Sequence, residues 1–111
     1  LYIGRSTCSV CVNTVPVLNQ VQAELNYKTN YLEVEVSKSK PWTDWQKELK
    51  ELTDKFNIET KVNSEEGTIG ELFYDHGYTP TTVIIKNGKV VDGFIGYRSK
   101  DVVKELVKKY L

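Results

Sequence analysis

The sequence predicts one α/β domain over residues 1–111, built from a mixed sheet with helices packed against it. Three patterns predict it: strand–helix–strand at the start, helical periodicity in the middle, and hairpin–helix at the end. A chain of 111 residues suffices for one hydrophobic core and is too short for two domains. Fifteen basic residues balance fifteen acidic ones, so no net charge attracts nucleic acid or an anionic membrane.

The first third of the chain is typical of a strand, a helix and a second strand. Residues 1–5 have the pattern of an apolar strand from the first residue onwards, which predicts that part of the natural chain precedes Leu1. From about Ser9, apolar residues recur with helical spacing, and Pro16 inside this helix should kink it. Residues 30–36 alternate between apolar and polar, which indicates a half-buried edge strand.

The middle of the chain is mainly helical in pattern. Pro41 is well placed in the first turn of a helix whose apolar face continues to Phe56. Residues 57–62 are a short strand or an extended connector, and residues 63–67 are expected to be a loop. A shorter helix is expected at about 68–75, and Gly77 follows where a C-terminal cap belongs.

The last third carries the clearest local signals. Two β-branched runs, 82–85 and 90–95, are joined across Asn87-Gly88, the strongest short hairpin signal. A final helix follows, with Ser99 as its N-cap and one apolar face for the sheet.

Cys8 and Cys11 are the only cysteines, and they lie three positions apart. Cys8 stands where the first strand gives way to the helix, and free N–H groups and the helix dipole stabilise a thiolate there. Cys11 is one turn further in, more shielded and close enough to attack a mixed disulfide on Cys8. Arg5, three residues upstream, could add positive charge near Cys8, but an arginine at such a position is more often a solvated surface residue, and that is what we expect. The pair therefore predicts two-electron thiol–disulfide exchange.

Two other interpretations of the pair have less support. A structural zinc ion usually takes four ligands, and the chain offers these two cysteines and a distant His76, so no metal site is expected. A purely structural disulfide closing so small a loop would remove little chain entropy.

The sequence around the cysteines resembles that of the thioredoxin family. The resemblance covers the chain except for roughly residues 38–67. The matching features are the C-x-x-C helix with its internal proline (8–16), Tyr74, Thr79-Pro80-Thr81, the Lys-Asn-Gly hairpin (84–89) and Gly96.

The resemblance implies a thioredoxin-like fold. Its four main strands would lie in the order 2-1-3-4, the last of them antiparallel, with helices on both faces and a helical insertion over 38–67 after the second strand. It also implies that Cys8 attacks and Cys11 resolves, without an organic cofactor. Pro80 would follow a cis peptide bond, and Thr79 and Pro80 would align the substrate chain.

The chain departs from the family at positions that influence redox behaviour. Thr7 stands where thioredoxins carry a tryptophan, and Ser-Val replaces Gly-Pro between the cysteines, so reductase behaviour cannot be carried over. Tyr2 stands where the family buries an acid. Glu33, on the neighbouring strand, is therefore a candidate proton-transfer group for Cys11.

These features predict a bacterial-type thiol–disulfide oxidoreductase. It would act as a monomer on protein or peptide thiols and disulfides, with an unidentified redox partner and no contact of this domain with nucleic acid or membrane. The Ile3-Gly4-Arg5 run also resembles thioredoxin-like accessory proteins of bacteriocin systems, which implies an exported peptide substrate. The alternative is a non-catalytic adaptor that binds a partner through the inserted helix. The sequence does not determine the direction of electron flow. It also leaves two compartments open, the bacterial cytoplasm or, if a signal or anchor was removed, the extracytoplasmic side.

Overall fold

A four-stranded mixed sheet in the order β2-β1-β5-β6 is the centre of the computed structural model, which describes residues 1–111. The predicted strand order is therefore confirmed. β3 and β4 form a separate two-stranded sheet. The elements in chain order are β1 (Tyr2–Gly4), α1 (Ser9–Leu25), β2 (Tyr31–Glu33), α2 (Trp42–Thr53), β3 (Glu59–Val62), β4 (Glu65–Thr68), α3 (Ile69–His76), β5 (Thr81–Lys86), β6 (Lys89–Ile95) and α4 (Lys100–Lys108).

The direction of β5 differs from the expectation that only the last strand is antiparallel. β1 pairs with β2 in parallel but with β5 in antiparallel register, Ile3 lying opposite Thr81, and β6 is antiparallel to β5. The reason is the place where the chain enters β5. The residues after α3 lie at the carboxyl end of β1, where Gly77 is hydrogen-bonded to Arg5, so β5 starts there and runs back along β1.

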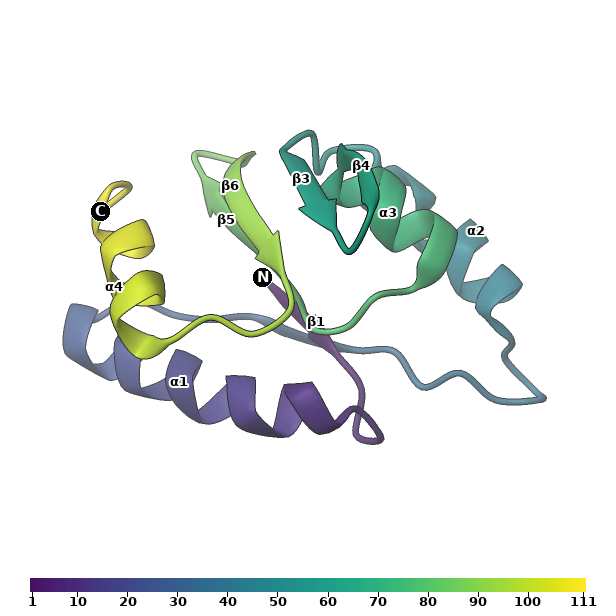
Figure 1. Ribbon diagram of the computed structural model, residues 1–111, viewed down its shortest axis with the longest axis horizontal. Helices are drawn as coiled ribbons and strands as arrows, with labels where there is room; N and C mark the ends of the chain where they lie inside the picture. The colour runs from purple at the N-terminus through teal and green to yellow at the C-terminus, as the bar shows by residue number, and fades with distance from the viewer.

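Helices cover both faces of the sheet, as predicted. Figure 1 shows α1 and α4 on one side, and α2 and α3 with the small hairpin on the other. Successive side chains of a strand point to opposite faces, so Tyr2 and Ile3 of β1 belong to different halves of the core. The half under α1 and α4 is formed by Tyr2, Cys11, Leu18, Val21, Phe94, Val103 and Val107. The half under α2 and α3 is formed by Ile3, Val34, Trp45, Leu49, Phe56, Ile69, Leu72, Phe73, Val83 and Ile95.

The inserted segment 38–67 contains a hairpin as well as the expected helix α2. The expected loop at 63–67 is wrong, because β4 occupies most of it and pairs with β3. Asn63 adopts a left-handed conformation with φ of 57°, which makes the turn tight enough for Val62 to lie opposite Glu65. The Glu-Glu-Gly sequence of β4 has little strand propensity of its own, and pairing with β3 supplies what the local sequence lacks.

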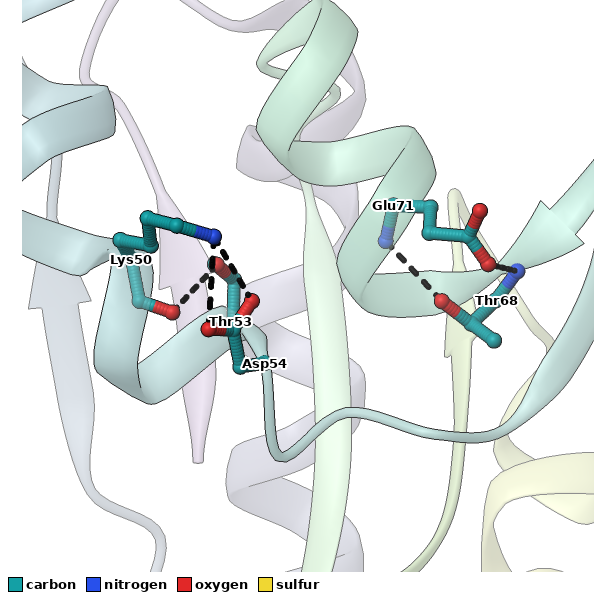
Figure 2. Close-up of polar contacts among 5 residues, drawn as sticks. All are labelled: Lys50, Thr53, Asp54, Thr68 and Glu71. Atoms are coloured by element: carbon teal, nitrogen blue, oxygen red, sulfur yellow. Dashed lines mark hydrogen bonds and ion pairs between the residues drawn. The ribbon is translucent and has the colours of Figure 1, made fainter.

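The end of α2 abuts the start of α3. Figure 2 shows the capping box of α3, in which the Glu71 N–H donates to the Thr68 hydroxyl and the Thr68 N–H donates to the Glu71 carboxylate. Gly70, the second residue of α3, donates its N–H to the Phe56 carbonyl at 3.0 Å. A Cβ atom on Gly70 would overlap the carbonyl oxygen of Thr53, so the two helices approach this closely only with glycine there.

Local signals placed the end of the chain correctly. Asn87 and Gly88 both have positive φ, 54° and 77°, as a type I′ hairpin turn requires. The Ser99 hydroxyl accepts a hydrogen bond from the Val102 N–H and caps α4. None of the helices has both the length and the apolar character needed to cross a membrane.

We expect Gly70→Ala to lower the free energy of unfolding by about 1–3 kcal/mol, because the added methyl group forces α2 and α3 apart. Urea denaturation measures the loss. The matched control is Gly67→Ala, since a Cβ atom there would meet nothing closer than 3.8 Å. Equal losses for the two variants would contradict the close contact at Gly70.

Candidate functional site

Cys8 and Cys11 form a disulfide at the start of α1, with their Cα atoms 5.2 Å apart. Cys8 is the N-cap residue of the helix, and Cys11 lies in its first turn. Cys11 is buried, with 4% of its surface exposed, whereas Cys8 is half-buried. Cys8 is therefore the more accessible residue of the two, as its predicted role as the attacking thiol requires.

The Cys8 sulfur occupies the place of the capping oxygen in an ordinary helix. The backbone N–H of Cys11 donates to it at 3.1 Å. The first turn of α1 contains no acidic residue that would counter the positive end of the helix dipole. When the disulfide is reduced, the same N–H and the same dipole stabilise a thiolate on Cys8.

The loop that contains Thr79 and Pro80 lies against the disulfide. The carbonyl oxygen of Thr79 is 3.5 Å from the Cys8 sulfur, and the peptide bond between Thr79 and Pro80 is cis. The N–H of Gly96 donates to the carbonyl oxygen of Pro80 at 2.8 Å, which brings the end of β6 to the same corner. The structure thus gathers the two cysteines and the two residues expected to align a substrate chain.

Arg5 is part of this corner, so the expectation of a solvated surface residue is wrong. Its Nε donates to Thr79 Oγ1 at 3.1 Å, and its Nη2 donates to the Gly77 carbonyl at 2.6 Å. The cause is the antiparallel register, because Ile3 lies opposite Thr81 and two further positions place Arg5 opposite Thr79. The guanidinium thereby fixes the loop that faces the disulfide.

The β3–β4 hairpin also contacts the residues that lead into this loop. The Tyr78 hydroxyl donates to the Glu65 carboxylate at 3.1 Å, and His76 pairs with Glu65 and stacks on the Tyr78 ring. Burial and the Glu65 carboxylate raise the pKa of Tyr78, so the phenol remains a neutral donor at physiological pH. The inserted hairpin is therefore linked to the residues just before Thr79.

Glu35 holds the segment that leads into Cys8. Its carboxylate accepts from the backbone N–H and from the hydroxyl of Ser6, both at 2.7 Å. These hydrogen bonds, the backbone one first, hold the pKa of Glu35 below its usual range, and the positive charge of Arg5 adds to them. Sequence reasoning missed Glu35, although its position just after β2, the parallel neighbour of β1, was a usable signal.

A hollow of about 440 Å³ lies beside Cys11 on the α1 side of the sheet. Glu33 lines it, because Glu33 of β2 is the register partner of Gly4 and their side-chain positions share one face. The candidate proton-transfer residue thus faces the same hollow as Cys11. No group of three or more His, Cys, Asp or Glu side chains in the structure is arranged to hold a metal ion.

No family model matches the chain, and no curated protein matches it. Among solved structures, it is similar to the crystal structure of the exposed lipoprotein thioredoxin of Streptococcus pneumoniae strain TIGR4. That likeness covers 97% of this chain and 81% of the pneumococcal one, with 20% sequence identity and a TM-score of 0.51. It shows that the chain has a thioredoxin-like fold.

We expect the Ser6 amide resonance to titrate with the Glu35 carboxylate. The pKa of Glu35 is lowered from 4.5, so above about pH 4.5 its carboxylate is ionised and accepts both hydrogen bonds from Ser6. These hydrogen bonds are lost as the pH falls through the lower pKa of the folded state. NMR titration measures the midpoint. Glu35→Ala should abolish this titration and Glu59→Ala should leave it unchanged, whereas a midpoint above 4.5 would contradict the assignment.

Proposed function

We propose that this chain is a thiol–disulfide oxidoreductase that exchanges its Cys8–Cys11 pair with the thiols and disulfides of protein or peptide substrates. The observation that carries the proposal is the position of the Cys8 sulfur, 3.1 Å from the Cys11 N–H and 3.5 Å from the Thr79 carbonyl oxygen. A thiolate at this point is stabilised by the helix start, reachable from solvent and adjacent to its resolving partner.

The exchange proceeds through a mixed disulfide. The Cys8 thiolate attacks one sulfur of a substrate disulfide, forms a bond to it and releases the other substrate sulfur as a thiolate. The Cys11 thiolate then attacks the Cys8 sulfur, which closes the Cys8–Cys11 disulfide and frees the second substrate thiolate. Two electrons pass to the substrate, whose thiolates take up protons. The reverse sequence oxidises a substrate dithiol, and neither direction needs an organic cofactor.

Apolar side chains near the dithiol favour a polypeptide substrate over a small thiol. Val10 and Val12 flank Cys11 and are 41% and 65% exposed, and Tyr97, next to Gly96, is 46% exposed. An extended chain lying along Thr79 would cover part of this apolar surface. The resemblance to bacteriocin-system accessory proteins favours an exported peptide. Because one chain supplies every group named in the site, we propose that it acts as a monomer.

The activity is tested by the reduction of insulin with dithiothreitol. We expect the wild-type chain to accelerate the reaction and Cys8→Ser to run at the uncatalysed rate, because the attacking thiolate is missing. Equal rates for the two proteins would contradict the proposal and favour the adaptor alternative, in which the inserted helix α2 binds a partner. The reduction potential then gives the direction, about −270 mV for a reductant and about −120 mV for an oxidant.

We also propose that Glu33 accepts the proton of Cys11 across the shared hollow. We expect Glu33→Gln to lower the titration midpoint of the Cys11 thiol, because removing a neighbouring negative charge favours the thiolate. The loss of the proton acceptor should also slow the closure of the mixed disulfide. Thiolate absorbance in the Cys8→Ser background measures the midpoint, and an unchanged midpoint would exclude this role for Glu33.

A further inference from the structure

Tyr2 is buried, lines the same hollow as Cys11 and has no hydrogen-bond partner for its hydroxyl. Its side chain is 4% exposed and belongs to the same half of the core as Cys11 and Leu18. The Tyr2 hydroxyl makes no hydrogen bond in the oxidised protein. Folded proteins seldom leave a buried hydroxyl unpaired, because it has lost its hydration without compensation. The hydroxyl therefore calls for a functional explanation.

The hydroxyl lies at the end of β1 that leads to the dithiol. Tyr2 and Gly4 are two positions apart on the strand, so their side-chain positions share one face. The ring extends along β1, and a Cβ atom on Gly4 would lie 2.6 Å from the phenol oxygen. Glycine at this position thus leaves room for the hydroxyl at the dithiol end of the strand.

The hollow beside Cys11 contains few groups that could interact with its sulfur. The titratable side chains that line it with Cys11 are Tyr2, Arg5, Tyr31 and Glu33. Arg5 is bonded to the Thr79 loop, and the Tyr31 hydroxyl donates to Asn19 at 2.7 Å. Burial raises the pKa of Tyr2, so this phenol keeps its proton at neutral pH and is available as a donor.

We infer that the Tyr2 hydroxyl donates a hydrogen bond to the Cys11 sulfur when that sulfur is ionised to the thiolate in the reduced protein. In the oxidised protein the Cys11 sulfur is bonded to Cys8 and carries no charge, and the hydroxyl is unpaired. When a substrate dithiol supplies two electrons and becomes a disulfide, the Cys8–Cys11 bond breaks and the two substrate protons pass to solvent or to the Cys8 and Cys11 sulfurs. Once ionised, the Cys11 sulfur is the acceptor that the hydroxyl lacked. The bond stabilises the reduced form, so the pair is a stronger oxidant than it would be with phenylalanine at position 2. This inference rests on the exchange function proposed above.

The test is Tyr2→Phe, which removes the hydroxyl and keeps the buried ring. In the Cys8→Ser background, we expect the variant to raise the titration midpoint of the Cys11 thiol by about one pH unit, a tenfold change typical of losing a hydrogen bond to a charged group. In the otherwise wild-type chain, at a pH above the Cys11 midpoint of both proteins, the equilibrium with glutathione should move about tenfold towards the disulfide, which is about 30 mV for a two-electron couple. The matched control is Tyr31→Phe, which removes a hydroxyl from the same hollow that already has a partner and should change neither value.

Thermal unfolding separates this role from a structural one. We expect Tyr2→Phe to raise the Tm of the oxidised protein, where the hydroxyl is unpaired, and to lower the Tm of the reduced protein, where it is bonded. Changes of the same sign in both forms, or an unchanged Cys11 midpoint, would overturn the inference. The titration and the glutathione equilibrium need no polypeptide substrate. Inactivity of the wild-type chain towards insulin, with the Tyr2→Phe shifts intact, would therefore contradict the proposed function and leave the hydrogen bond standing.

Discussion

The antiparallel register of β1 and β5 is the constraint on which the site depends. With Ile3 opposite Thr81, the last residues of β1 meet the first residues of β5, and Arg5 comes within reach of Thr79. The Cys8 sulfur and the Thr79 carbonyl then face each other at 3.5 Å. A shift of one residue would turn Tyr2 away from α1 and Ile3 towards it, because neighbouring side chains on a strand point to opposite faces. The register therefore fixes both the site and the division of the core.

The parts of the fold that could be predicted are those that depend on neighbours in sequence. Cys8 at a helix start, Asn87-Gly88 in a hairpin turn and Ser99 as a cap each act on residues within one turn of themselves. The strand β4 and the direction of β5 could not be predicted in this way, because they depend on contacts with other parts of the chain. β4 exists because β3 lies beside it, and β5 runs as it does because the chain leaves α3 at the dithiol end of the sheet.

The same distinction divides the site residues. Cys8 and Cys11 were evident from their spacing, and Thr79 and Pro80 from a resemblance that carries long-range information. The roles of Arg5 and Glu35 were not evident from the sequence, because these side chains are hydrogen-bonded to residues 74 and 29 positions away in the chain. Single-residue preferences place an arginine or a glutamate at the surface by default, and only the pairing of distant strands overrides that preference.

The two sulfurs are consequently tuned by different parts of the molecule. The partner of the Cys8 sulfur is the Cys11 N–H, a contact within one helical turn that any similar helix start would provide. The surroundings of Cys11 are set by the sheet, where Tyr2 and Glu33 line its hollow from adjacent strands. A reduction potential depends on the stability of both sulfurs in the reduced form relative to the disulfide. On the roles proposed for Tyr2 and Glu33, the dipeptide between the cysteines sets only part of the redox poise, and the β1–β2 pair contributes to it through residues outside the C-x-x-C sequence.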